Sequence, residues 1–176
     1  YGNGTLVSSS WDSTAIVWDL DTREAKYHLK GHQASVWDAL ALSKTDFLTA
    51  SADGTIRRWQ GNATVKTYQG HRDVVRKLAV LQDGKSFASC SNDGSIIVWD
   101  LESGLIQYTL QGHESFIYDL AVLPQGDLVL TGEDRTVRVW LTKTRQILQV
   151  LTLPCISVWC CDTFPNGDIV AGGSDN

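Results

Sequence analysis

The sequence predicts an all-β protein made of about four copies of a four-stranded antiparallel sheet. Two spacings carry this prediction: four tryptophans recur every 40 or 41 residues, and five aspartates recur at the same period. A period of this length indicates one repeated supersecondary unit. The tryptophans are Trp18, Trp59, Trp99 and Trp140, and the aspartates are Asp12, Asp53, Asp93, Asp134 and Asp175.

Each repeat divides into short strand-like runs. In the second repeat these runs cover residues 35–42, 47–51, 55–60 and 64–68, and turn-forming residues such as Asp53-Gly54 separate them. Apolar residues do not recur at the three- and four-residue spacing of a helix. The repeat therefore predicts four strands, here called a to d in chain order.

Gly-His pairs at Gly31-His32, Gly70-His71 and Gly112-His113 precede the tryptophans at a similar period. Gly-His followed by Trp-Asp is typical of the WD40-type β-propeller blade. We expect one propeller segment over residues 1–176, with whole blades at about 34–69, 74–110 and 115–151 and partial blades at 1–30 and 155–176. Closed propellers hold about 4 to 8 blades, and we expect this segment to form part of a seven-bladed ring.

In WD40-type blades a hydrogen-bonded chain joins the turn aspartate, the histidine, a hydroxyl and the tryptophan. Because such a set recurs once per blade, we interpret it as structural rather than as a hydrolase triad. Leu153-Pro154 replaces the next Gly-His, so Asp175 should lack its histidine. The expected sets are His32, Asp53, Ser51 or Thr49, and Trp59; His71, Asp93, Ser91 or Ser89, and Trp99; and His113, Asp134, Thr131 and Trp140.

Composition excludes several classes of function. The net charge of −5 argues against binding to nucleic acid or to an anionic membrane. The sequence has no phosphate-binding glycine loop and no cysteine spacing of a metal site, so we expect no cofactor, no metal and no enzyme activity. We expect Cys90, Cys155, Cys160 and Cys161 to be reduced, buried, small apolar side chains in a protein of the cytoplasm and also of the nucleus.

Near the start of strand a, one position in each repeat holds a large aromatic or arginine side chain, and the residue before it is aliphatic. We call these equivalent positions a column. The column consists of Trp37, Arg76, Tyr118 and Trp159, with Phe116 close by in the sequence. Aromatic and arginine side chains are the usual anchors of protein interfaces, so these five residues are the candidate partner-binding site. Inward packing around the propeller axis is the alternative.

Several segments resemble the propeller of the phospholipase A2-activating protein family. The most specific is 153–159, which resembles that family's own replacement for a Gly-His blade; the others are 10–15, 34–39, 47–53, 133–138, 166–170 and 173–176. The resemblance implies a ubiquitin-binding module that acts in ubiquitin-dependent turnover. It also implies an AAA segregase partner, valosin-containing protein, which that family binds through domains other than this propeller.

Two alternatives remain at this stage. A generic scaffold propeller would use the same face for a different protein or peptide. A hydrolytic enzyme would need one Ser-His-Asp set out of step with the other blades, and the sequence shows none.

Overall fold

The computed structural model describes residues 4–111 and 113–174, and every helix or strand within them is a β-strand. The chain forms two compact units, Tyr1–Leu78 and Ala79–Asn176, and each is described by itself. Gly112 and Asp175, both named in the sequence predictions, lie outside the described residues. The all-β class is confirmed.

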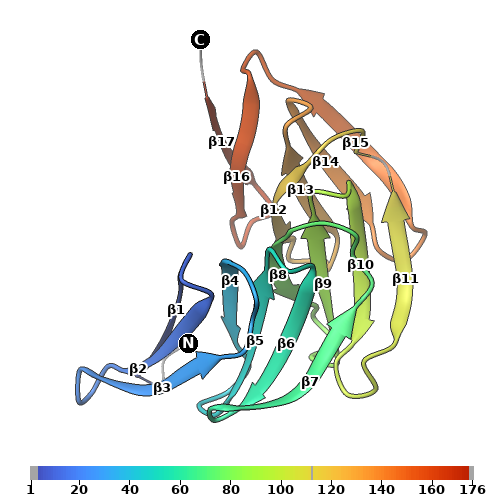
Figure 1. Ribbon diagram of the computed structural model, residues 1–176. Helices are drawn as coiled ribbons and strands as arrows, with labels where there is room; N and C mark the ends of the chain where they lie inside the picture. Colours follow the sequence, from blue (N-terminus) through green and yellow to red (C-terminus); the bar gives the residue numbers. More distant parts are fainter. Residues whose placement is uncertain (1–3, 112, 175–176) are drawn as a thin grey trace. The chain divides into compact units, whose positions relative to one another are not determined.

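The first unit contains two complete antiparallel sheets. The first sheet has the order β1-β2-β3 and the second the order β4-β5-β6-β7 (Figure 1). Each connection is short, so consecutive strands pair with each other. The bounds are β1 Thr5–Ser9, β2 Thr14–Asp19, β3 Glu24–Lys30, β4 Val36–Ala41, β5 Asp46–Ser51, β6 Thr55–Gln60 and β7 Ala63–Gln69.

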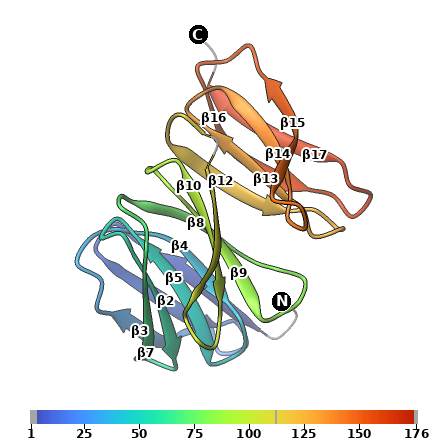
Figure 2. The ribbon, with the colours of Figure 1, turned by 90° about the vertical axis from the view of Figure 1, so that its right-hand side faces the viewer.

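The strand that follows, β8 (Val75–Val80), spans the boundary between the units and belongs to a sheet of order β11-β10-β9-β8. The next sheet has the order β12-β13-β14-β15, and both ribbon views show these strands side by side (Figures 1 and 2). The last two strands pair as β16-β17. The bounds are β9 Ser86–Ser91, β10 Ser95–Asp100, β11 Ile106–Gln111, β12 Ile117–Val122, β13 Leu128–Gly132, β14 Thr136–Leu141, β15 Gln146–Thr152, β16 Ser157–Thr163 and β17 Ile169–Ser174.

An aspartate side chain stabilises the turn between the second and third strands of a sheet. In the β5–β6 turn Asp53 accepts hydrogen bonds from the backbone and hydroxyl of Thr55, at 2.9 and 2.6 Å. Gly54 follows with a φ of +78°, a conformation in which glycine has no steric cost. This requirement explains the repeated Asp-Gly at this point of the chain.

Apolar side chains of neighbouring sheets pack together to form the cores. In the first unit Val17 and Leu29 of one sheet join Phe47 and Trp59 of the next. In the second unit one cluster joins β10 and β11 to β12, β13 and β14, and another joins β12–β14 to Val158 of β16. A sheet that buries both faces in this way must be apolar on both, which fits the continuous burial of β9 and β13.

Successive sheets are also joined by half-buried carboxylates. Asp38 on β4 accepts a hydrogen bond from the backbone N–H of Leu78 on β8 at 2.9 Å and contacts Lys77 Nζ at 3.3 Å. Asp119 on β12 accepts one from the N–H of Cys161 on β16 at 2.8 Å. Burial raises the pKa of Asp38. Each carboxylate thus satisfies a donor one repeat further along the chain.

The cysteine prediction is partly wrong. Cys90 is buried, Cys155 and Cys161 are half-buried, and Cys160 is exposed on β16; all four are free. The two adjacent cysteines differ because side chains alternate along a strand. No helix within residues 4–111 and 113–174 is long and apolar enough to cross a membrane.

Candidate protein-interaction site

The first predicted set of His, Asp and Trp forms one buried network. His32 Nδ1 lies 2.9 Å from Asp53 Oδ2, and His32 Nε2 lies 2.7 Å from Thr49 Oγ1. Trp59 Nε1 donates to the same Thr49 oxygen at 2.8 Å. Thr49 rather than Ser51 is therefore the hydroxyl of this network, since Ser51 donates to the carbonyl of Ala34.

The protonation of this network follows from burial and charge. Burial lowers the pKa of His32 below 6.5, so the ring is neutral at pH 7. Burial alone would raise the pKa of Asp53, but hydrogen bonds from Thr55, Gln33 and His32 outweigh it and hold the pKa at about 2. The single ring proton must then lie on Nδ1 and face the carboxylate. Nε2 accepts from Thr49, whose oxygen accepts from Trp59.

The second set is divided between the units, because His71 lies in the first and Asp93 in the second. Within the second unit Trp99 Nε1 donates to Ser89 Oγ at 2.8 Å, so Ser89 takes the role that Thr49 takes in the first set. Asp93 accepts from the backbone and hydroxyl of Ser95.

The third set differs from the predicted chain. His113 Nδ1 lies 3.0 Å from Asp134 Oδ2, as the sequence pattern suggests. Beyond that contact the predicted chain is broken, because Leu130 and not Thr131 takes the position that Thr49 has in the first set. His113 Nε2 and Trp140 Nε1 are buried and have no hydrogen-bond partner in the described part of the chain. Arg138 Nη2 also donates a hydrogen bond to Asp134 Oδ2, at 2.9 Å, so this oxygen contacts both His113 and Arg138.

None of these sets suits catalysis. His32 and His113 are buried, the carboxylates are committed to turn hydrogen bonds, and a tryptophan ends the first network. The residues that the structure describes also contain no group of three potential metal ligands.

The candidate binding residues occupy a distinctive backbone position. In three sheets the pairing of the first two strands skips one residue, and the skipped residues are Trp37, Tyr118 and Trp159. An extra residue opposite one partner is a β-bulge, and bulges redirect a side chain out of the regular alternation. The bulges explain why aromatic residues at these positions can leave the sheet core.

In the first unit Trp37 forms part of a tryptophan–arginine cluster with Trp11 and Arg76. The two indole centroids are 6.0 Å apart, and Arg76 Cζ lies 4.1 Å from the Trp37 ring centroid. Trp11 is 77% exposed and Trp37 36% exposed. Trp11 was missed as a site residue, although it directly precedes a turn aspartate where other repeats carry Ala52 or Asn92.

In the second unit three aromatic residues form what we call the aromatic ladder: Phe116, Tyr118 and Trp159. Tyr118 and Trp159 are stacked, with centroids 4.8 Å apart and an interplanar angle of 10°. Phe116 meets Tyr118 edge to face at 6.5 Å. Trp159 is 53% exposed and Phe116 37% exposed. The ladder is therefore a rigid apolar surface open to solvent.

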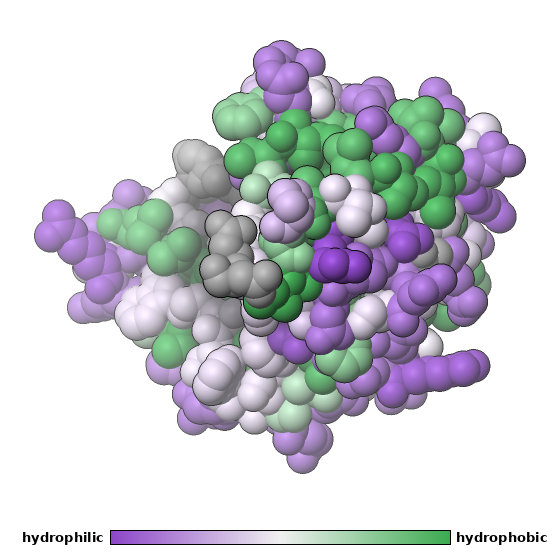
Figure 3. Space-filling view, turned by 90° about the horizontal axis from the view of Figure 1, so that it is seen from above, coloured by the Kyte–Doolittle hydropathy of each residue, from purple (hydrophilic) through white to green (hydrophobic). Residues whose placement is uncertain are grey.

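Acidic residues flank the ladder on the same loops. Glu133 follows β13 and Glu114 precedes β12, and both are exposed. Ser115 Oγ donates to Glu133 Oε2 at 2.5 Å, which fixes one oxygen of that carboxylate. Figure 3 shows one face of the molecule, on which hydrophobic residues in green gather in part of the surface and hydrophilic residues in purple lie beside them.

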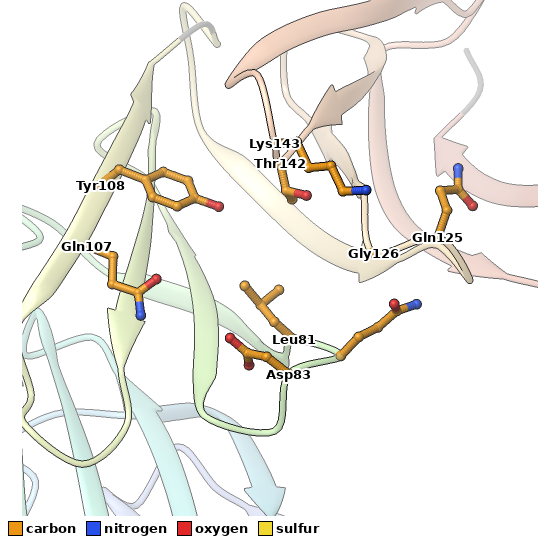
Figure 4. Close-up of a pocket in the computed structure, with 9 residues that line it drawn as sticks. Leu81, Asp83, Gln107, Tyr108, Gln125, Gly126, Thr142 and Lys143 are labelled. Carbon is orange, nitrogen blue, oxygen red and sulfur yellow. The ribbon is translucent and has the colours of Figure 1, made fainter.

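A pocket of about 260 Å³ lies at the opposite end of the second unit's strands. Figure 4 shows Gln107 and Tyr108 of β11 on one side and Thr142 and Lys143, from the β14–β15 turn, on the other. Leu81, Gln82, Asp83, Gln125 and Gly126 complete its lining. Most of its lining residues have polar side chains, although apolar atoms form the larger part of its wall, and none of the candidate site residues lines it.

Comparison with known proteins gives consistent matches. The model of the WD domain, G-beta repeat, matches residues 23–60, 62–100 and 104–140. The ubiquitin homeostasis protein lub1 of Schizosaccharomyces pombe is 48% identical over 212 residues, covering 98% of this chain and 29% of that protein. Protein DOA1 of Saccharomyces cerevisiae is 50% identical over 127 residues, covering 70% of this chain and 17% of that protein.

The ubiquitin fusion degradation protein 3 homologue of Caenorhabditis elegans is 38% identical over 194 residues, covering 97% of this chain and 21% of that protein. The chain thus spans less than a third of the length of these relatives. Among solved structures, the WD40 β-propeller domain of Doa1 matches with a TM-score of 0.94 and 50% identity, covering all of this chain and 60% of that chain.

Proposed function

The chain belongs to the WD40 repeat family, as a homologue of the lub1 and DOA1 propellers, and from this premise we propose that it is a non-catalytic module that binds ubiquitin. The predicted resemblance to the phospholipase A2-activating protein family is confirmed by these relatives. The proposed role is in ubiquitin-dependent protein turnover. It draws on two relatives whose names refer to ubiquitin homeostasis and to ubiquitin fusion degradation.

The aromatic ladder is the observation that carries the proposal. Tyr118 and Trp159 stack on strands β12 and β16, and Phe116, just before β12, meets Tyr118 edge to face. Aromatic anchors of this kind supply most of the binding energy of protein interfaces. Ubiquitin offers a small apolar patch ringed by basic residues, which complements an apolar ladder flanked by Glu114 and Glu133.

The affinity of such an interface should be modest. Three ladder side chains form a contact at the small end of the size range, where transient signalling complexes lie. The segregase contact that the family resemblance implies is assigned there to other domains, and we propose no such contact for these residues.

The test is a titration of isotope-labelled ubiquitin with the purified protein, followed by NMR. Removal of both stacked rings, Tyr118→Ala with Trp159→Ala, should weaken binding at least about tenfold, since loss of a single hot-spot contact of about 2 kcal/mol already exceeds the roughly 1.4 kcal/mol of a tenfold change. Phe164→Ala is the matched control, because Phe164 is an exposed aromatic in the β16–β17 turn at the other end of the strand. It should bind as the unmodified protein does.

Equal ubiquitin binding by the double variant and the Phe164→Ala control would reject the ladder as the binding face. Absence of ubiquitin binding by the unmodified protein would reject the proposed function. In that case, retention of one stoichiometric partner in an affinity capture would favour the generic scaffold propeller.

A further inference from the structure

The sheet β12–β15 departs from the other repeats at two neighbouring positions. Phe116 stands where the other repeats carry Ser35, Val74 and Ser157, and Glu133 stands where they carry Trp11, Ala52 and Asn92. Both lie on loops of the same end of this sheet, because one precedes β12 and the other follows β13. The residue type at both positions varies between the repeats, as is common on loops that contact a partner.

The backbone and one side chain hold Glu133 beside the aromatic ladder. The N–H of Glu133 donates to the carbonyl of Phe116 at 3.0 Å, so the two residues lie next to each other. Ser115 Oγ donates to Glu133 Oε2 at 2.5 Å. One carboxylate oxygen is therefore fixed by Ser115, and Oε1 makes no hydrogen bond to the described residues.

The charge of Glu133 is also unpaired within the described part of the chain. Glu133 makes no salt bridge there, although Asp38, Asp46 and Asp134 all pair with a lysine or an arginine. An exposed carboxylate held in one orientation beside an apolar surface is pre-organised for a cation that arrives with an apolar partner.

We propose that Glu133 is a specificity-determining residue for ubiquitin, with Ser115 as its positioning residue. The carboxylate pairs with a lysine or arginine side chain at the rim of ubiquitin's apolar patch, while the aromatic ladder covers the patch itself. This inference rests on the proposed function. Glu133 then favours a partner whose apolar patch is surrounded by cations over a partner whose apolar patch is surrounded by anions.

Because the Glu133 side chain is exposed to solvent, its effect on ubiquitin affinity should be small and should depend on the salt concentration. A rim charge pair in water contributes little to affinity, acts mainly on the association rate and is screened by salt over about 10 Å at 0.1 M. Glu133→Gln should therefore weaken ubiquitin binding about two- to fivefold at 50 mM salt. At 500 mM salt the difference should be less than about 1.5-fold, because the charge interaction is then screened.

The experiment measures the dissociation constant of ubiquitin by calorimetry for Glu133→Gln and Glu133→Lys at both salt concentrations. Glu133→Lys should weaken binding about tenfold or more at low salt, since it places like charges together. Glu24→Gln is the control, because Glu24 is an exposed carboxylate in the first unit. It should change binding less than about 1.5-fold, which excludes an effect of net charge alone.

Ser115 provides a second, independent readout. Ser115→Ala should reproduce part of the loss seen with Glu133→Gln, and Ser115→Thr should restore binding because it keeps the hydroxyl. In Glu133→Gln, the further change Ser115→Ala should add less than it does alone, as expected for two residues that act through one contact.

Two outcomes overturn the inference in distinguishable ways. Unchanged low-salt binding by Glu133→Gln and Glu133→Lys, together with weakened binding by the Tyr118→Ala, Trp159→Ala variant, would remove Glu133 and leave the proposed function standing. Lack of ubiquitin binding by the unmodified protein would remove both.

Discussion

Replacing the hydroxyl of Thr49 tests the hydrogen-bond network directly. Thr49→Val keeps the shape of the side chain but leaves His32 Nε2 without a donor and Trp59 Nε1 without an acceptor, since these atoms lie 2.7 and 2.8 Å from Thr49 Oγ1. A buried polar group left unpaired costs about 1 to 3 kcal/mol. With two such groups, we expect the free energy of unfolding to fall by about 2 to 6 kcal/mol.

The third repeat offers a contrasting case at Thr131, next to Leu130, which takes the position of Thr49. The buried hydroxyl of Thr131 lies near Cys161 and does not link a histidine to a tryptophan, so Thr131→Val leaves no histidine or tryptophan nitrogen newly unpaired. We expect a free energy of unfolding within about 1 kcal/mol of that of the unmodified protein, or slightly above it. Thr49→Ser should lose much less stability than Thr49→Val, because it keeps the hydroxyl.

Both substitutions are compared by denaturant unfolding followed by tryptophan fluorescence, and by thermal melting. A loss of about 2 to 6 kcal/mol corresponds to a melting temperature lower by about 4 to 24 °C for a protein of this size. Equal losses for Thr49→Val and Thr131→Val would refute the reasoning, because the hydroxyl's hydrogen bonds would then not decide the cost.

Three further predictions concern acid, the cysteines and the contacts between sheets. Burial lowers the pKa values of His32 and His113, so the unfolded chain binds more protons below pH 6.5, and the urea midpoint should fall from pH 7.5 to pH 5. It should fall further from about pH 4 to 2, because the pKa of Asp53 is about 2 when folded and 3.8 otherwise; a constant midpoint would contradict this. With a thiol reagent at pH 8, exposed Cys160 should react first, and Cys161 should stay protected because burial raises its pKa to about 12. A fast reaction that persists in Cys160→Ser would show this to be wrong. Asp119→Ala should lower the free energy of unfolding by about 1 to 3 kcal/mol, as the N–H of Cys161 loses its acceptor, and Asp119→Asn by less. Urea midpoints of both variants equal to that of the unmodified protein would exclude this role.

The repeat spacing made the fold predictable from the sequence. Each strand boundary is marked locally, by turn residues such as Asp53-Gly54, and each sheet forms from consecutive strands. Local signals of this kind need no knowledge of distant contacts. The family was predictable for the same reason, since Gly-His and Trp-Asp recur in step with the strands.

The details of the networks were less predictable. Thr49 and Ser51 are two residues apart on one strand and point to the same face, so the pattern alone could not choose between them. The strand register decides, because it pairs Phe47 with Trp59 and so brings the indole towards Thr49. The broken network of the third repeat, by contrast, has a cause in the sequence. When Trp140 is aligned with Trp59, Leu130 and not Thr131 falls at the position of Thr49, so this repeat has no hydroxyl there.

The candidate site was predictable in its residue types and not in its geometry. The column of aromatic residues was visible, but the bulges at Trp37, Tyr118 and Trp159 that turn these side chains outward are properties of strand pairing. The roles of Trp11 and Glu133 depend on contacts with Trp37 and Ser115, and only the folded chain shows them. A comparison of the residue before each turn aspartate would have pointed to both.

The carboxylates of Asp38 and Asp119 have a consequence for cooperativity. Each accepts its backbone hydrogen bond from a strand one repeat further along, so a sheet is complete only when its successor is folded. In repeat proteins, coupling between nearest neighbours sets how far local unfolding spreads. Damage to one sheet should therefore raise hydrogen exchange in the sheet before it as well. Through Asp38 and Asp119, the stability of a sheet therefore depends on which sheet follows it, and not only on its own sequence.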